Sequence, residues 1–283
     1  MGPTAAGKSA MALDFADSCG GEIVSVDSMQ LYRGLEIGTA QPTAAEKKQI
    51  PHHLVGILDI SERIDVFSYC EMADQVISDI AARGKIPVLA GGTGFYFKSL
   101  FYGLDNLPGD RDLRQELDEL YDNSEGEKAL KVKLSDLDPD ALEKFSSSRR
   151  KMIRALEVKL LSGRSILELQ QQKPQTLRYD VEAFYLEIAP DVLRKKIAAR
   201  AAYMLENGWI EEAEKAIANG LMKSPTAWQA IGYNHIHSFC LGEISRSELL
   251  EKIITSTCQY ARRQRTWFRH QHPEAKVITP SDL

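Results

Sequence analysis

The stretch GPTAAGKS, residues 2–9, decides the fold of this chain. It fits the pattern G-x-x-x-x-G-K-[ST], whose glycines let backbone N–H groups surround an anion at the start of a helix. Apolar residues at helical spacing follow between Met11 and Ala16, which predicts that helix. Lys8 supplies a positive charge for a terminal phosphate, and the hydroxyl of Ser9 can ligate Mg²⁺. The stretch therefore predicts a phosphate-binding loop, called the P-loop below.

Short apolar strands alternate with helices over the first hundred residues. Residues 22–26 predict a strand that ends at Asp27, and residues 86–90 predict a strand that runs into Gly91-Gly-Thr-Gly94. Residues 67–83 between them have the spacing of an amphipathic helix. This alternation predicts an α/β fold of the P-loop NTPase type, with a parallel sheet flanked by helices.

The pattern changes at about Arg111, where strand-like runs stop and leucines follow helical spacing. A strand signal returns once, at residues 181–188, and we expect the chain beyond it to be helical. The expected organisation is an α/β core from residues 1–110 and 178–283, with C-terminal helices. A mostly helical insertion is expected at residues 111–177.

Apolar runs and cysteine spacing argue against a membrane-spanning protein and against a CxxC site. No apolar run approaches the ~20 residues that cross a bilayer, and the four cysteines have no CxxC spacing. A cytoplasmic protein with reduced thiols and no membrane partner is expected.

The net charge of −5 argues weakly against nucleic-acid binding. However, residues 259–272 contain four arginines and no acid, and residues 149–154 form a second basic cluster.

A P-loop alone is typical of nucleotide-binding and ATP-binding proteins, including small-molecule kinases. Such enzymes usually carry a strand that ends in an Asp near Mg²⁺. Here the only strand that ends in an acid is the one before Asp27. Asp27 is then a carboxylate beside the metal, a base aimed at an acceptor, or the cap of a helix that begins near Ser28. The residues alone leave these three roles open.

Several motifs in one order give a more specific indication. They are the P-loop, DSMQLYRG (27–34), IGTAQP (37–42), GGTGFY (91–96), RALEV (154–158), AIGY (230–233) and QYARRQRTWFR (259–269). Together they resemble the tRNA dimethylallyltransferases of the IPP transferase family, in the bacterial form. The chain departs from the family at Ala6, where Ser is usual, and at Asn234-His235, where a charged residue is common.

The resemblance implies a prenyl transfer. A dimethylallyl group would pass from dimethylallyl diphosphate to the exocyclic N6 amine of the adenosine 3′ to the anticodon. This adenosine is position 37 in tRNAs that read codons beginning with U, and pyrophosphate is released. The resemblance also implies Mg²⁺, and we expect a monomer. The alternatives are an adenylate isopentenyltransferase, which uses a free nucleotide, a P-loop kinase, and a non-catalytic RNA-binding protein.

The resemblance further assigns residues to roles. The catalytic residues would be Asp27 as the base, Thr4 near the reacting carbon, and Arg200 on a basic helix. The diphosphate would bind to Gly2, Pro3, Thr4, Ala5, Ala6, Gly7, Lys8, Ser9, Thr93 and Arg200, with Ser9 as the metal ligand. The tRNA, with the helical insertion taking part, would contact Asp27, Ser28, Met29, Gln30, Thr93, Arg114, Arg150, Lys151, Arg154, Arg262, Arg263, Gln264, Arg265, Trp267 and Arg269.

A buried strand normally leads into a P-loop, yet only Met1 precedes Gly2. Relatives begin with a short apolar strand before Gly-Pro-Thr. The hypothesis from the sequence is that on the order of 5–8 residues forming this strand are missing, since strands have about that length. Extension of the chain by such a strand is then expected to raise its melting temperature and its donor affinity.

Overall fold

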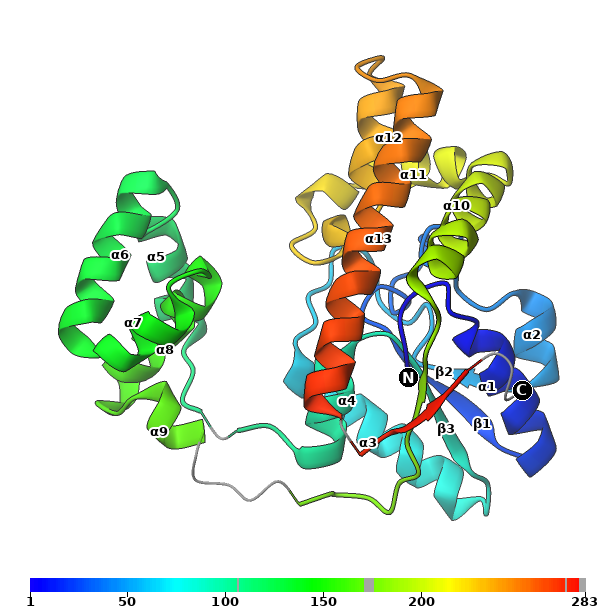
Figure 1. Ribbon diagram of the computed structural model, residues 1–283, viewed down its shortest axis with the longest axis horizontal. Helices are drawn as coiled ribbons and strands as arrows, with labels where there is room; N and C mark the ends of the chain where they lie inside the picture. Colours follow the sequence, from blue (N-terminus) through cyan, green and yellow to red (C-terminus); the bar gives the residue numbers. More distant parts are fainter. Residues whose placement is uncertain (106, 171–175, 273, 280–283) are drawn as a thin grey trace. The chain divides into compact units, whose positions relative to one another are not determined.

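Figure 1 shows the chain as a computed structural model, which describes residues 1–105, 107–170, 176–272 and 274–279. Its contacts divide the chain into two compact units. The first consists of Met1–Tyr102 with Leu177–Leu283, and the second of Gly103–Thr176. In the described ranges, no helix is both long enough and apolar enough to cross a membrane.

A three-stranded parallel sheet lies in the first unit, in the order β2-β1-β3. The strands are β1 (Glu22–Val26), β2 (His52–His53) and β3 (Pro87–Gly91). Ile23 packs with residues of α1 (Lys8–Cys19), whereas Val24 and Val26 pack with residues of α3 (Val66–Ala82). Because strand side chains alternate between faces, α1 and α3 cover opposite faces of the sheet. The predicted α/β fold with a parallel sheet is therefore confirmed.

Further helices complete the first unit. They are α4 (Gly94–Tyr102), α10 (Pro190–Glu206), α11 (Trp209–Ala218), α12 (Tyr233–Cys240) and α13 (Arg246–Gln271), together with the short α2 (Ala44–Gln49), η1 (Leu221–Lys223) and η2 (Ala227–Gln229). A capping box of Ser245 and Glu248 starts α13. In Figure 1, α13 is the long orange-to-red helix, and it packs against α4, α10 and α12. It thus reaches from the α/β sheet to the C-terminal helices.

A second parallel pair consists of β4 (Phe184–Leu186) and β5 (Lys276–Ile278). The sequence prediction of a strand at 181–188 is right in place but too long. The expectation that only helices follow it is wrong, because β5 follows α13. Only three residues make up β5 and Val277 is exposed, so the sequence there has no alternating pattern that would predict a strand.

Met1 lies on the other side of β4, where its amine donates to the Phe184 carbonyl, and the Leu186 amide donates to the Met1 carbonyl. The strand expected before the P-loop stays a prediction.

The second unit is helical in its described residues. Its helices are α5 (Arg111–Leu120), α6 (Ser124–Leu137), α7 (Pro139–Phe145), α8 (Arg149–Ser162) and α9 (Ile166–Gln170). Leucines at helical spacing, among them Leu117, Leu130, Leu134 and Leu156, pack into one core. This apolar spacing is the same signal that predicted helices here from the sequence.

Candidate active site

The P-loop joins Met1 to the first turn of α1. Ala5 (φ 61°) and Gly7 (φ 103°) both adopt left-handed backbone conformations, which turn the loop tightly. Gly7 is also the N-cap of α1, and it has no side chain to bond the first N–H groups of the helix. These N–H groups, together with the helix dipole, suit an anion. The backbone of this loop is therefore suited to an anion, and its binding of the diphosphate stays a prediction.

Lys8 folds back over the loop, where its Nζ donates to the Pro3 carbonyl at 2.6 Å. Burial lowers the pKa of Lys8 to about 8; the Asp27 carboxylate opposes this shift and the Arg200 guanidinium adds to it. At neutral pH the ammonium is therefore still mostly protonated. Lys8 is half-buried, and among the described residues its hydrogen-bond partner is a neutral carbonyl, an environment that favours binding of an anion.

Arg200 of α10 brings a second cation to the same place. Its Nη2 donates to Thr4 Oγ1 at 2.7 Å. Burial lowers the pKa of Arg200, and Asp27 partly offsets this. Lys8 and Arg200 thus reach the loop from two different helices, and the Asp27 carboxylate influences the pKa of both, so these three groups together carry a net positive charge.

Asp27 lies directly after β1, at the carboxyl end of the parallel strands, where ligands bind in folds of this class. Its Oδ1 accepts from the Met29 amide at 2.9 Å. Residues 28–31 form a turn, so the alternative in which Asp27 caps a helix near Ser28 is wrong. The Thr93 hydroxyl accepts from the Ser28 amide at 3.1 Å, which joins this turn to the segment after β3.

One cleft of about 420 Å³ contains these groups. Side chains that line it include Thr4, Lys8, Ser9, Ser25, Asp27, Gln30, His52, Lys196 and Arg200. The structure therefore brings the three predicted catalytic residues to one cavity. Sequence reasoning missed Lys196, which lies one helical turn before Arg200 on α10.

Residues 39–42 line this cleft, and two side chains hold them and the two residues just before them. Gln30 Nε2 donates to the carbonyls of Thr39 (3.2 Å) and Ala40 (2.9 Å). From α11, the Glu212 carboxylate accepts from the amides of Ile37 (2.7 Å) and Gly38 (2.9 Å). Sequence reasoning missed Glu212, because its partners lie about 175 residues away and no local pattern connects them.

Comparison with known proteins decides the family. Residues 30–271 match the IPP transferase family, and residues 1–56 match the isopentenyl transferase family. The chain belongs to the IPP transferase family. It is 39% identical over 272 residues to the tRNA dimethylallyltransferase of Geobacter sulfurreducens, covering 95% of this chain and 87% of that one. It is 37% identical over 275 residues to that of Thermoanaerobacter sp. (strain X514), with the same coverage.

Solved structures agree with this assignment. The full-length tRNA isopentenylpyrophosphate transferase of Bacillus halodurans is 35% identical, with a TM-score of 0.71, over 98% of this chain and 88% of that one. A eukaryotic dimethylallyltransferase studied while acting on tRNA is 27% identical, with a TM-score of 0.82, over 98% of this chain and 72% of that one. The expected membership of the IPP transferase family is confirmed.

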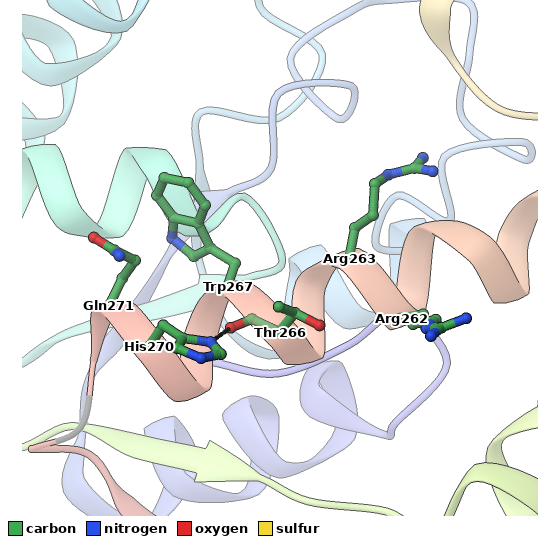
Figure 2. A pocket seen from close by; sticks show the side chains of 6 residues that line it. All are labelled: Arg262, Arg263, Thr266, Trp267, His270 and Gln271. Carbon is green, nitrogen blue, oxygen red and sulfur yellow. Dashed lines mark hydrogen bonds between the residues drawn. The ribbon is translucent and has the colours of Figure 1, made fainter. Parts of the chain in front are cut away.

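In this IPP transferase, α13 presents some of the predicted tRNA residues to solvent. Arg262 and Arg263 are exposed, and with the half-buried Trp267 they line a shallow hollow of about 390 Å³ (Figure 2). Arg265 is half-buried, and Arg269 is ion-paired with Glu187. The clearest exposed cations for RNA phosphates on this helix segment are therefore Arg262 and Arg263.

Other predicted tRNA residues have partners within the protein. In the second unit, Arg114 and Arg154 each bond the buried Glu157 carboxylate at 2.7 Å, whereas Arg150 and Lys151 are exposed on α8. In the first unit, Gln264 of α13 is buried rather than exposed. The tRNA contacts of all these residues stay predictions. Glu157 belongs to the RALEV motif, but only the structure reveals that it is a shared acceptor for two arginines.

Proposed function

We propose that this chain transfers a dimethylallyl group from dimethylallyl diphosphate to N6 of adenosine 37 in tRNA and releases pyrophosphate. The supporting observation is that two cations, Lys8 and Arg200, line the same cleft as the carboxylate of Asp27. An anionic leaving group and a proton acceptor are the two requirements of such a transfer. The relatives named tRNA dimethylallyltransferases support the same reaction.

On the donor side, the diphosphate would lie in the P-loop. Negative charge grows on the pyrophosphate as its bond to the prenyl carbon breaks. N–H groups at the start of α1, Lys8 and Arg200 are placed to stabilise that charge. Thr4, which bonds Arg200, would lie beside the oxygen that bridges the diphosphate to the prenyl carbon.

On the acceptor side, the exocyclic amine of adenine is a weak nucleophile, because its lone pair is delocalised into the ring. A carboxylate that accepts its proton during attack contributes about 10²–10⁴-fold. Asp27 would serve as this base, since the Met29 amide fixes the orientation of its carboxylate. The adenine must first leave the stack of the anticodon loop, which costs a few kcal/mol.

The site also suits Mg²⁺. This ion usually binds one or two protein oxygens together with phosphate oxygens and water. Ser9 is exposed on the first turn of α1 and lines the cleft with Asp27, so it can supply such an oxygen. In the described ranges, no three His, Cys, Asp or Glu side chains form a metal cluster, so the diphosphate itself would provide most ligands. Bound Mg²⁺ would offset charge on the leaving pyrophosphate.

The tRNA would bind to the exposed side of α13. We expect Arg262→Ala with Arg263→Ala to weaken tRNA binding and to lower the slope of log K against log salt by ~0.7 per lost phosphate contact. The measurement is a salt titration of binding to an anticodon stem-loop. Lys252→Ala is the matched control, since Lys252 is an exposed cation in the first half of the same helix. An unchanged slope in the double variant would mean that these arginines do not contact phosphates.

A free nucleotide is the competing acceptor, because residues 1–56 also match the isopentenyl transferase family. Labelled dimethylallyl diphosphate offered with AMP and with an anticodon stem-loop separates the two acceptors. We expect label only in the RNA. Label in AMP would support the free-nucleotide reaction, and phosphoryl transfer from ATP would support a kinase. We propose that the protein acts as a monomer, as expected from the sequence.

A further inference from the structure

The side-chain amide of Gln264 is a buried polar group that has no role in the prenyl transfer as proposed. Gln264 is only 5% exposed, on the inner side of α13. Its Oε1 accepts from the Thr4 amide at 2.8 Å, and its Nε2 donates to the Gly92 carbonyl at 2.8 Å. A buried amide is costly unless it is hydrogen-bonded, and here both of its ends are bonded.

These two bonds fix which way the amide points. The Thr4 N–H can only donate and the Gly92 carbonyl can only accept, so the reverse orientation of the amide would break both contacts. The fit at Gly92 is also close, because a Cβ at that position would lie 2.3 Å from Gln264 Nε2. The length of the Gln264 side chain, its acceptor and its donor therefore suit the Thr4 N–H in the P-loop on one side and the Gly92 carbonyl after β3 on the other.

Both segments that Gln264 joins lead directly to reacting groups. The Thr4 amide donates to Gln264, and the Thr4 hydroxyl accepts from Arg200. Thr93, next to Gly92, accepts from the amide of Ser28, the residue that follows Asp27. A single side chain thus links the cation on the leaving-group side to the carboxylate on the acceptor side.

We propose that Gln264 is a positioning residue, which holds Thr4 and the segment after β3 at the spacing that the prenyl transfer requires. This inference rests on the proposed function. It gives Gln264 a different role from the tRNA contact expected from the sequence, because its amide faces the protein interior. The neighbouring Arg263 is exposed and remains available to RNA.

The test compares kcat with tRNA affinity. Gln264→Met keeps the length of the side chain and leaves the Thr4 N–H and the Gly92 carbonyl without partners. We expect kcat at saturating donor and stem-loop to fall about 10- to 100-fold, since a lost buried hydrogen bond has an effect of that order. The Kd for the stem-loop and its salt slope should stay at wild-type values. Thr257→Val is the matched control, because Thr257 is buried on the same helix two turns earlier.

Gln264→Glu keeps the shape and the acceptor for the Thr4 amide, but turns a carboxylate oxygen towards the Gly92 carbonyl. It should also lose kcat, and it serves as the second variant if Gln264→Met does not fold. Wild-type kcat in a folded variant would overturn the proposal. Normal kcat with a weakened stem-loop Kd would also overturn it and would make Gln264 an RNA contact. If the wild-type chain itself transfers no prenyl group in this assay, it is the proposed function that fails.

Discussion

Asp27→Asn is expected to reduce kcat for prenyl transfer by about 10²–10⁴-fold, the contribution of a general base. Asn keeps the size of the side chain, and its oxygen can still accept from the Met29 amide, so the turn after β1 should persist. What the variant lacks is a carboxylate that can accept the proton of the adenine amine. Single-turnover rates with saturating dimethylallyl diphosphate and stem-loop measure the effect.

Binding measurements separate this loss from a general disturbance. The Kd for the stem-loop should change little, because the variant keeps the shape of the site. Asp17→Asn is the control, since Asp17 is an exposed carboxylate on α1. Near-normal turnover by Asp27→Asn would remove Asp27 from the role of base.

Arg200→Ala is expected to lower kcat/KM for dimethylallyl diphosphate by about 10²–10³-fold, as when a donor to a developing negative charge is removed. The guanidinium lies against Thr4 at the mouth of the P-loop, so its loss removes both a cation and the partner of the Thr4 hydroxyl. Steady-state kinetics with varied donor concentration measure the effect.

Two related variants sharpen this test. Arg200→Lys should recover only part of the rate, because an ammonium lacks the planar fork of the guanidinium. Arg194→Ala should be near wild type, since Arg194 is exposed on the same helix. If Arg200→Ala weakens stem-loop binding and leaves the donor kinetics unchanged, Arg200 belongs to the RNA site instead.

The sequence predicts the local parts of this site well. The P-loop and the strand before Asp27 are each one continuous stretch of sequence, and the spacing of residue types within each stretch indicates its backbone structure. The strand that ends at Gly91 is of the same kind. Each of these elements forms where its own residues predict it. Motifs of this kind are visible because phosphate binding needs particular residues at fixed short distances along the chain.

Contacts between distant segments could not be predicted. The Gln264 side chain lies in a stretch rich in arginine, so composition favoured RNA binding, but the helix turns it inward. Glu157 attracts Arg114 and Arg154, which the sequence alone presents as free cations. A helix has two faces, and which of them is buried depends on tertiary packing that single-sequence patterns do not contain.

The central claim is that the P-loop cleft transfers a prenyl group to one adenosine of tRNA. Its most direct test is mass spectrometry of nucleosides from an anticodon stem-loop incubated with the protein, dimethylallyl diphosphate and Mg²⁺. The account predicts that one adenosine, at position 37, gains a single dimethylallyl group on N6, and that a stem-loop with guanosine there gains none. An unmodified position 37 at saturating donor, or prenylation spread over other adenosines, would contradict it.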